Sequence, residues 1–331
     1  MKNDSFRVLI VGCGNLGSRH LQAVASLPFV REIEVVDPRA EALARVRDLL
    51  LEMPQRQSGV SFRCVAALED VTPGGDLCII ATQARGRSEI VFRVSELLHY
   101  RSFLIEKVVT QSVRDYERLL DFVKRDRLSV WVNCKSRAYP IHQYVKSKLR
   151  PEEPILFNSM AGNHGLANNG VHAVDLFSFY DASKEIECLT SLVDPILHPS
   201  KRGKDIFDLS GTLIGKTAKG GTLSLSYATD HVGPDHISIV TKSYRCIIDH
   251  FCRWAVESNG EKGNSWHPVS FDGNLMVSNM TKTFTTDILK NGRCQLPTLE
   301  ECWPAHRFIL EALQPHFNQL LGRDLGYCPV T

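Results

Sequence analysis

A glycine-rich segment between an apolar run and an amphipathic run constrains the fold of this chain more than any other feature. Val8-Leu9-Ile10-Val11 has the composition of a strand buried in a parallel sheet. Gly12-Cys13-Gly14-Asn15-Leu16-Gly17 follows it and leads into a run with apolar residues at helical spacing. Twenty positions past Gly17, a second apolar run ends at Asp37. This order of elements predicts a strand, a tight turn, a helix and a second strand that together bind a dinucleotide.

The glycines and the acid have separate expected roles in that site. The glycines allow the tight turn and a close backbone approach, while the helix N-terminus presents N–H groups to a pyrophosphate. Asp37 is expected to accept hydrogen bonds from the adenine ribose and to repel a 2′-phosphate, which favours NAD over NADP. Arg39 keeps NADP open, because its guanidinium could pair with a 2′-phosphate or lie on the adenine. The predicted cofactor-binding residues here are Gly12, Gly14, Asn15, Leu16, Gly17, Asp37 and Arg39.

Length and composition indicate a globular protein with two domains. The chain has 331 residues, 43% of them hydrophobic and 23% charged, and a net charge of +2. Such a balance gives no strong field that would draw nucleic acid or an anionic membrane. No apolar signal segment precedes the first strand, and no apolar stretch approaches eighteen residues. We therefore expect a cytoplasmic protein with neither a nucleic-acid nor a membrane partner.

The ten cysteines are scattered, and they predict no metal centre. The tightest pair, Cys246 and Cys252, is separated by five residues, and no C-x-x-C occurs in the sequence. This spacing does not favour zinc or iron–sulfur ligation, and it is typical of reduced thiols in a cytoplasm. We expect no metal and no cysteine chemistry.

Two patterns of secondary structure divide the chain. Strand and helix alternate up to a strand at residues 129–133, which predicts an α/β fold, an N-terminal Rossmann doubly wound parallel sheet over residues 1–134. Residues 211–228 and 236–250 then resemble two hairpins, which predicts an α+β domain over residues 135–331 with an open, mainly antiparallel sheet. A last helix over residues 299–320 contains two prolines, and we expect a kink at Pro315 and packing back on the first domain.

Several motifs resemble one known family. Gly17-Ser18-Arg19-His20, Ile105-Glu106-Lys107-Val108, residues 132–140 and residues 168–175 together are similar to the Gfo/Idh/MocA family, the relatives of glucose–fructose oxidoreductase and inositol dehydrogenase. The resemblance covers nearly the whole chain. Residues 163–169 also resemble a subgroup found with bacterial surface-glycan and nucleotide-sugar genes.

The resemblance implies an NAD(P)-dependent oxidoreductase acting on a sugar, a polyol or a nucleotide sugar. It also implies that the open sheet forms the interface of a homodimer or homotetramer. Lys107 matches the family lysine near the nicotinamide and the reacting oxygen, and His172 matches the catalytic histidine. We therefore expect Lys107 to stabilise the charge on the oxygen and His172 to act as acid and base.

The chain departs from the family pattern at four positions. Val108 replaces a proline, Asn168 an aspartate, Gln83 a proline and Arg87 a histidine. An amide cannot take a proton, so we expect Asn168 to orient the substrate as a third residue of the catalytic site. Beside these, the predicted cofactor contacts are Ala81, Thr82, Gln83, Glu106 and Lys107, and the predicted substrate contacts are Arg137, Tyr139, His164, Asn168, Asn169 and His172.

Structural roles are open for most of these residues. Lys107 could be solvated, His172 could be a hydrogen-bonded core residue, and Asp175 could be a structural partner. A surface salt bridge would explain Arg137 as well as a substrate contact would. Four further basic residues could bind the phosphates of a nucleotide sugar, although solvated side chains are the expectation: Arg85, Arg87, Lys201 and Arg202.

Other functions also fit the fold. The Asn168 departure keeps a reductase of imines or other carbonyls open. A catalytically silent NAD(H)-binding sensor or subunit is a second alternative, and an enzyme that recycles a tightly bound cofactor is a third. A methyltransferase is disfavoured, because the Glu106-Lys107 strand end and the second sheet would have no role in it.

Overall fold

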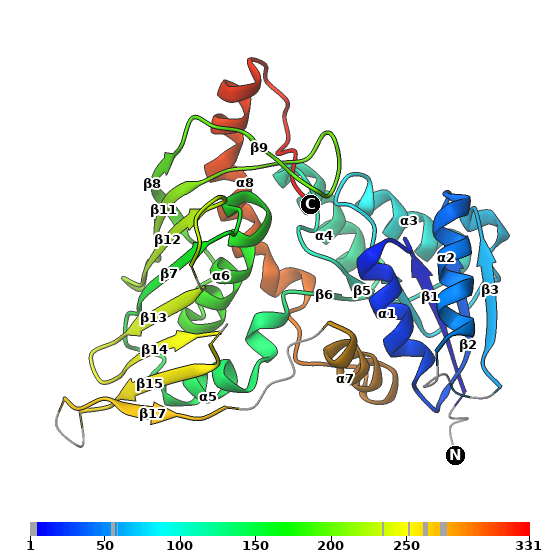
Figure 1. The fold of residues 1–331 in the computed structure, drawn as a ribbon, viewed down its shortest axis with the longest axis horizontal. Coiled ribbons are helices and arrows are strands. Elements are labelled where there is room, and N and C mark those ends of the chain that lie inside the picture. The colour runs from blue at the N-terminus through cyan, green and yellow to red at the C-terminus, as the bar shows by residue number, and fades with distance from the viewer. Residues whose placement is uncertain are drawn as a thin grey trace. The chain divides into compact units, whose positions relative to one another are not determined.

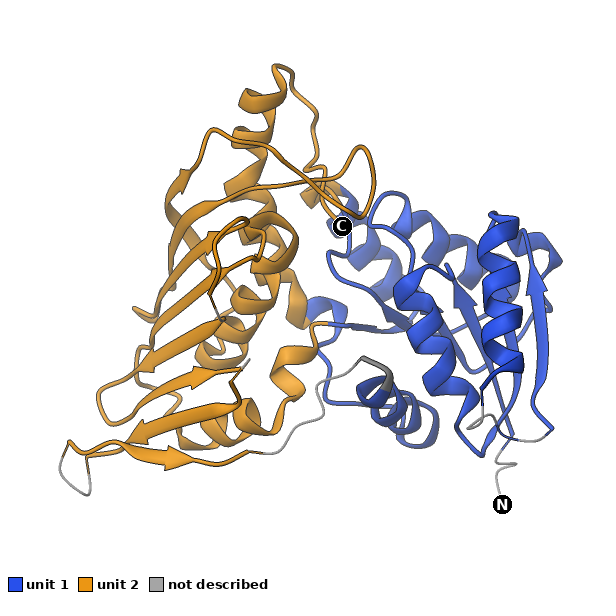
Figure 2. Ribbon diagram, in the orientation of Figure 1, with its two compact units in different colours: residues 1–110, 115–133, 274–300 blue, residues 111–114, 134–273, 301–331 orange. Residues whose placement is uncertain are grey.

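The computed structural model describes residues 5–53, 57, 59–233, 235–250, 252–260, 264–271 and 277–331. The chain forms two compact units (Figure 2), the first made of residues 1–110, 115–133 and 274–300, and the second of residues 111–114, 134–273 and 301–331. The chain crosses from the first unit to the second between residues 133 and 134, one residue before the boundary expected after residue 134. Residues 274–300, however, return to the first unit. Residues 1–4, where we looked for a signal segment, lie outside the described residues.

The first unit contains the predicted parallel sheet (Figure 1). Its six strands lie in the order β3-β2-β1-β4-β5-β6, and every described pair is parallel, which is the doubly wound Rossmann order. The strands are β1 (Phe6–Val11), β2 (Val30–Val36), β3 (Ser61–Val65), β4 (Leu77–Ile80), β5 (Ser102–Ile105) and β6 (Ser129–Val132). The helices between them are α1 (Asn15–Ala25), α2 (Ala40–Leu51), η1 (Leu68–Asp70), α3 (Arg87–Leu98) and α4 (Val113–Arg125).

The central strands of this sheet are buried on both faces. All four residues of β4 are buried, as are Val8 to Val11 of β1 and Phe103 to Ile105 of β5. The near-continuous apolar runs predicted from the sequence are therefore confirmed as the core of the sheet. Since the strands are parallel, the loops that follow β1, β4 and β5 lie at one edge, and that edge is where this fold binds ligands.

A helix that we did not predict completes the first unit. Helix α7 (Val277–Asn291) packs against α1. His20 Nδ1 of α1 lies 2.9 Å from Thr281 Oγ1, and the Lys290 ammonium lies 4.5 Å from the centre of the Phe29 ring. The last helix was expected to pack back on this unit; its residues 299–300 are grouped with the first unit and its residues from 301 onward with the second.

The second unit contains an eight-stranded mixed sheet in the order β17-β15-β14-β13-β7-β12-β11-β8. The β7–β12 pair is parallel and the other pairs are antiparallel, as the expected mainly antiparallel sheet requires. Both predicted hairpins, β11–β12 and β13–β14, are present. The strands are β7 (Leu156–Gly162), β8 (Glu187–Val193), β11 (Gly211–Lys216), β12 (Thr222–Ala228), β13 (His236–Val240), β14 (Arg245–Asp249), β15 (Trp254–Ser258) and β17 (His267–Val269), with a separate short pair β9 (His198–Pro199) and β10 (Phe207–Asp208).

Helices cover one face of this second sheet. Phe308 of α8 (Leu299–Leu321) lies against Gly215 of β11, and α6 (Leu166–Asp181) packs on β12. Tyr144 of α5 (Pro140–Lys148), which follows η2 (Lys135–Ala138), donates a hydrogen bond to Glu257 of β15. Helix α8 runs through both prolines, and most of its apolar residues are buried. Among the described helices, none is both long and apolar enough to cross a lipid bilayer.

Candidate functional site

The loop after β1 has the geometry that a dinucleotide requires. Gly12 has a φ of +88°, and a Cβ there would lie 2.9 Å from the Thr82 side chain. A Cβ on Gly17 would lie 1.9 Å from the Gly12 carbonyl oxygen, so only glycine allows helix and strand to approach this closely. At Gly14 the nearest described atom to a Cβ is Arg39 Nη2, 3.9 Å away, which leaves the backbone open to a phosphate. The loop therefore fits the pyrophosphate of NAD(P).

The Asp37 carboxylate is engaged by its own chain. It is 2% exposed and accepts hydrogen bonds from the Cys13 amide at 2.9 Å and from Arg39 Nε and Nη2 at 2.9 and 2.8 Å. Burial alone raises the pKa of Asp37, but the bonds from Arg39 and Cys13 outweigh it and lower the pKa to about 2. The carboxylate is therefore ionised at neutral pH. A ribose hydroxyl that binds Asp37 must share it with Arg39 or displace the guanidinium.

The predicted lysine follows β5 at the same edge of the sheet. Lys107 is 7% exposed, and the Lys107–Val108 peptide bond is cis although residue 108 is not proline. The preceding carboxylate, Glu106, accepts a hydrogen bond from Asn133 Nδ2 at 2.6 Å and lies 2.9 Å from His20 Nε2. Burial alone raises the pKa of Glu106, but these bonds outweigh it and lower the pKa to about 2. Lys107 therefore follows a carboxylate that is fixed and ionised.

Arg87 differs from the expectation of a solvated or phosphate-binding side chain. It is the first residue of α3, is 1% exposed, and donates hydrogen bonds to backbone carbonyls of the loops after β4 and β5. Arg85, two residues earlier, is exposed as expected. The reversal of burial comes from the helix start, which turns residue 87 inward toward the sheet edge. Gln83, a predicted cofactor contact in the same loop, is exposed.

In the second unit, the Asn168 amide is used inside the protein. Asn168 is buried in the first turn of α6, and its Nδ2 donates to the Phe207 carbonyl at 2.8 Å and to Asp208 Oδ2 at 2.9 Å. Its Oδ1 accepts a hydrogen bond from the Thr331 amide at 2.8 Å. These bonds use both Nδ2 protons and one lone pair of Oδ1. The structure thus gives Asn168 a structural role beside the substrate role expected of it.

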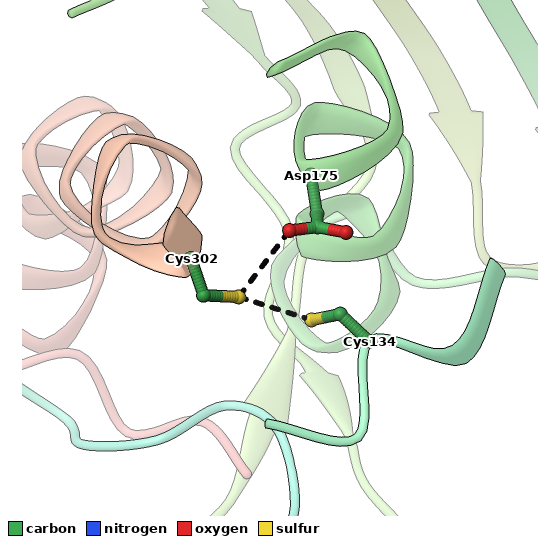
Figure 3. Close-up of side chains that lie close together, drawn as sticks. All are labelled: Cys134, Asp175 and Cys302. Atoms are coloured by element: carbon green, nitrogen blue, oxygen red, sulfur yellow. Dashed lines mark hydrogen bonds between the residues drawn. The ribbon is translucent and has the colours of Figure 1, made fainter. Parts of the chain in front are cut away.

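Arg137 forms a salt bridge, but a buried one. Its Nε and Nη2 donate to the two oxygens of Asp175 at 2.9 and 2.5 Å, which gives Asp175 the structural role left open by the sequence. Within the described part of the chain, Cys134, Asp175 and Cys302 bring metal-ligand atoms within 4.8 Å of one another. The Cys302 sulfur lies 3.4 Å from both Cys134 Sγ and Asp175 Oδ1 (Figure 3), and burial raises the pKa of the Cys302 thiol. We describe the group as a buried ion pair beside two thiols.

The other predicted substrate contacts lie at three places in the second unit. Tyr139 is buried, stacked on His142 with ring centres 6.0 Å apart, and burial raises its pKa. His164 is half-buried after β7, with its ring 6.4 Å from that of Tyr227. Asn169 and His172 are half-buried on α6. Only the last three expose part of their side chains.

Comparison with known proteins assigns the nucleotide-binding domain. Residues 6–134 match the oxidoreductase family with an NAD-binding Rossmann fold known as Gfo/Idh/MocA. The chain has the NAD-binding domain of a Gfo/Idh/MocA oxidoreductase. Over these residues the match supports the expected family, and the expected Rossmann fold and enzyme class, an NAD(P)-dependent dehydrogenase or reductase, are confirmed.

Three similar proteins are all named as dehydrogenases. The oxidoreductase is 24% identical over 243 residues, 68% of its length, to 4-carboxy-2-hydroxymuconate-6-semialdehyde dehydrogenase of Sphingobium sp. (strain NBRC 103272 / SYK-6), 73% of which is covered. Levoglucosan dehydrogenase in complex with NADH and levoglucosan has a TM-score of 0.75 at 13% identity, covering 96% of this chain and 98% of that one. UDP-N-acetylglucosamine 3-dehydrogenase from Acidithiobacillus ferrooxidans has a TM-score of 0.68 at 14% identity, covering 98% of each chain. At such identities the two structures share the fold of the oxidoreductase.

Two sets of buried side-chain contacts, those of Glu106 and those of His142, were not predicted from the sequence. His20 and Asn133 bind the Glu106 carboxylate, and both belong to motifs that carried only the family resemblance. The position of Asn133 directly after β6 could have indicated its role, because β6 neighbours β5 in the sheet. In the second unit, His142 Nδ1 lies 2.5 Å from the Tyr180 hydroxyl and His142 Nε2 lies 2.6 Å from His250 Nε2. No periodicity in the sequence predicts these contacts.

Proposed function

We propose that this oxidoreductase transfers a hydride between NAD(H) and a carbinol or carbonyl carbon of a sugar, polyol or nucleotide sugar. The observation that carries the proposal is the juxtaposition of two loops at one sheet edge, the glycine loop after β1 and Lys107 after β5. The bound cofactor supplies the hydride acceptor or donor. NAD is preferred over NADP in this proposal, because the ionised Asp37 would repel a 2′-phosphate.

The residues of the chain handle charge and proton. The Lys107 ammonium stabilises negative charge on the substrate oxygen as the hydride leaves or arrives. His172 takes up the proton released by a carbinol, or returns it to the oxygen of a carbonyl. Asn169 and His164 contact the substrate hydroxyls. Sugar-like substrates are favoured by two similar folds, a levoglucosan dehydrogenase and a nucleotide-sugar dehydrogenase.

The first experiment is a reductase and dehydrogenase screen. NADH absorbance is followed in wild type, Lys107→Ala and the control Lys124→Ala, first with NAD and pooled sugars, polyols and nucleotide sugars, and then with NADH and the corresponding carbonyl compounds. Lys124 is an exposed lysine on α4 of the same unit. We expect turnover in wild type and control, and a loss of roughly 10²–10⁴-fold in kcat for Lys107→Ala.

Two outcomes would contradict the proposal. Equal kcat in Lys107→Ala and wild type would remove the role of the lysine, and a His172→Ala variant that keeps wild-type kcat across pH would remove that of the histidine. Silence of wild type toward the panel in both directions, with NADH still bound by fluorescence, would instead support a sensor, a recycled cofactor or an imine substrate.

The open face of the second sheet is proposed to bind a second copy of this chain. Alternate residues of β7 point away from the helices, and Leu156 and Met160 are 51% and 50% exposed beside the hydroxyl-rich strand β12. Trp254 of β15 is also exposed. A mixed apolar and small polar face on a one-sided sheet is typical of an interface between copies. Light scattering at micromolar concentration should give a dimer or tetramer that Met160→Glu dissociates, and a monomeric wild type would refute this.

A further inference from the structure

Arg87 stands out because it is a buried cation whose hydrogen bonds, within the part of the chain that the structure describes, go to backbone carbonyls. Its Nη1 donates to the Glu106 carbonyl at 2.6 Å and to the Val108 carbonyl, and lies 3.4 Å from the Val109 carbonyl. Its Nη2 donates to the Thr82 carbonyl. Burying a charge is costly unless its surroundings compensate it, and here backbone carbonyls do so. Five donors in a rigid planar fork allow one guanidinium to reach several carbonyls at once.

These carbonyls belong to the two loops that carry the proposed chemistry. The Glu106 and Val108 carbonyls are on either side of Lys107, so one side chain holds the backbone before and after the lysine. The Thr82 carbonyl lies in the loop after β4, which also packs on Gly12 of the glycine loop. Arg87 therefore ties the lysine loop to the wall of the dinucleotide site.

The charge of Arg87 persists at neutral pH. Burial lowers the pKa of Arg87 to about 10, with the Glu106 carboxylate acting against that shift. The guanidinium is thus a permanent cation beside the lysine loop. A neutral side chain at residue 87 would leave the carbonyls without their donor and let the loop relax. A displacement of about 1 Å at a reacting group can cost about 10²-fold in rate.

We propose that Arg87 is the positioning residue for Lys107, fixing its backbone relative to the dinucleotide-binding loops. The proposal rests on the function proposed for Lys107, and a double-mutant cycle separates the two. If Arg87 acts through Lys107, replacing Arg87 must lower kcat only slightly in a variant that lacks the lysine. Arg87→Met should lower kcat about 30–300-fold in the wild-type background and less than about threefold in Lys107→Ala.

The variants are assayed with the panel compound that wild type turns over fastest. Arg85→Met is the matched control, since Arg85 is an exposed arginine in the same loop, and it should change kcat less than about twofold. Arg87→Lys keeps a cation and one donor nitrogen, so its kcat should lie between those of Arg87→Met and wild type. The dissociation constant for NADH, measured by fluorescence, should stay within about fivefold in each of them, which shows that the dinucleotide site has survived.

A second measurement needs no substrate. The rate at which acetic anhydride acetylates Lys107 is followed by mass spectrometry across pH, relative to Lys124 in the same sample. Removing a neighbouring cation and loosening the loop should shift the Lys107 profile in Arg87→Met to higher pH, and leave it unchanged in Arg85→Met. If Arg87→Met does not fold, Arg87→Lys is used for both measurements, and because it keeps the cation but loses most of the donors, a smaller loss of kcat and a smaller shift of the acetylation profile are expected.

Each outcome decides one of the two proposals. Equal fold losses of kcat from Arg87→Met with and without Lys107, or an unshifted acetylation profile, would overturn the positioning role. Wild-type activity in Lys107→Ala would overturn the function of the lysine instead, while the acetylation profile would still test the position of its loop.

Discussion

In the first unit, Lys107 and Asp37 follow strands buried on both faces, whereas in the second unit Arg137 and Asn168 precede or begin helices that cover one face of a sheet. A parallel sheet gathers the loops after its strands at one edge, so strand order alone brings the first pair near the glycine loop. In the second unit, the motif match located the residues but not their partners. Their polar groups are engaged in buried bonds to Asp175, Asp208 and Phe207. The same kind of sequence signal thus marks residues proposed to carry chemistry in the first unit and residues held in buried hydrogen bonds in the second.

The largest expected effect tests whether the Arg137–Asp175 pair of the second unit stabilises the fold. Arg137→Met should lower the free energy of unfolding by about 3–5 kcal/mol, because it leaves the Asp175 carboxylate buried without its cation. The control is Arg307→Met, which breaks an exposed pair with Glu311 on α8 and should cost less than about 1 kcal/mol. Urea unfolding followed by circular dichroism measures both. A small loss of stability with a collapse of kcat/KM would instead make Arg137 a substrate contact.

The Glu106 carboxylate should give the next largest effect, through pH. Its pKa of about 2 in the folded chain is below its ordinary value of 4.5. Its contribution to the free energy of unfolding is therefore complete above about pH 4.5 and is lost as pH falls toward 2. Glu106→Gln should therefore cost about 3 kcal/mol at neutral pH and flatten the loss of stability in acid.

Thermal unfolding between pH 7 and pH 3 measures this prediction. Glu89→Gln is the control, because Glu89 pairs with Arg118 on the surface of the same unit. Parallel curves for Glu106→Gln and wild type would show that the buried network does not depend on the charge of Glu106.

Cofactor affinity should respond to Asp37 by a smaller amount. Asp37→Ala removes the acceptor proposed for the ribose hydroxyls and should raise the dissociation constant of NADH about 10–100-fold. Arg39→Ala should change it less than about threefold, since the exposed guanidinium binds Asp37 rather than a phosphate. Fluorescence titrations with NADH and NADPH test both variants. A selective loss of NADPH affinity in Arg39→Ala would show that Arg39 binds a 2′-phosphate.

The smallest expected effect distinguishes two glycines of one loop. The protein has space for the methyl group of Gly14→Ala, so the melting temperature of this variant should be unchanged. The methyl group would, however, contact a bound pyrophosphate and raise the dissociation constant of NADH about tenfold. Gly17→Ala is the reference, because its Cβ would overlap the Gly12 carbonyl oxygen and disrupt the loop itself. Unchanged NADH affinity in Gly14→Ala would move the pyrophosphate away from this turn.

The fold of the first unit was predictable because each of its elements has a local signal. Apolar runs such as Leu77–Ile80 mark buried parallel strands, and the glycine spacing marks the turn. The hairpins of the second unit were predictable from alternation around Gly220 and Gly221. Helix α7 was not predicted, and its packing partner α1 lies more than 250 residues earlier, as His20 and Thr281 show.

The sequence predicted where the residues of the candidate site lie in the first unit, but not the hydrogen bonds that they and their neighbours form. The sequence could place Lys107, Asp37 and the glycines at an edge, since strand order determines that. It could not place the Arg87 guanidinium on carbonyls after two different strands, because those bonds depend on rotamers and burial. Nor could it foresee that Asn168 binds Asp208 and Thr331, which are far from it in sequence.

The return of residues 274–300 to the first unit has a consequence for the order of synthesis. A ribosome adds about 5–20 residues per second, so roughly 7–30 s pass between the emergence of Asn133 and that of α7. During that time the nascent first domain presents the surface formed by His20 of α1 and by Phe29, which precedes β2, and α7 later covers this surface. A gene fragment ending at residue 133 would permanently expose that surface, so an isolated NAD-binding domain should be expressed with residues 274–300 joined to it.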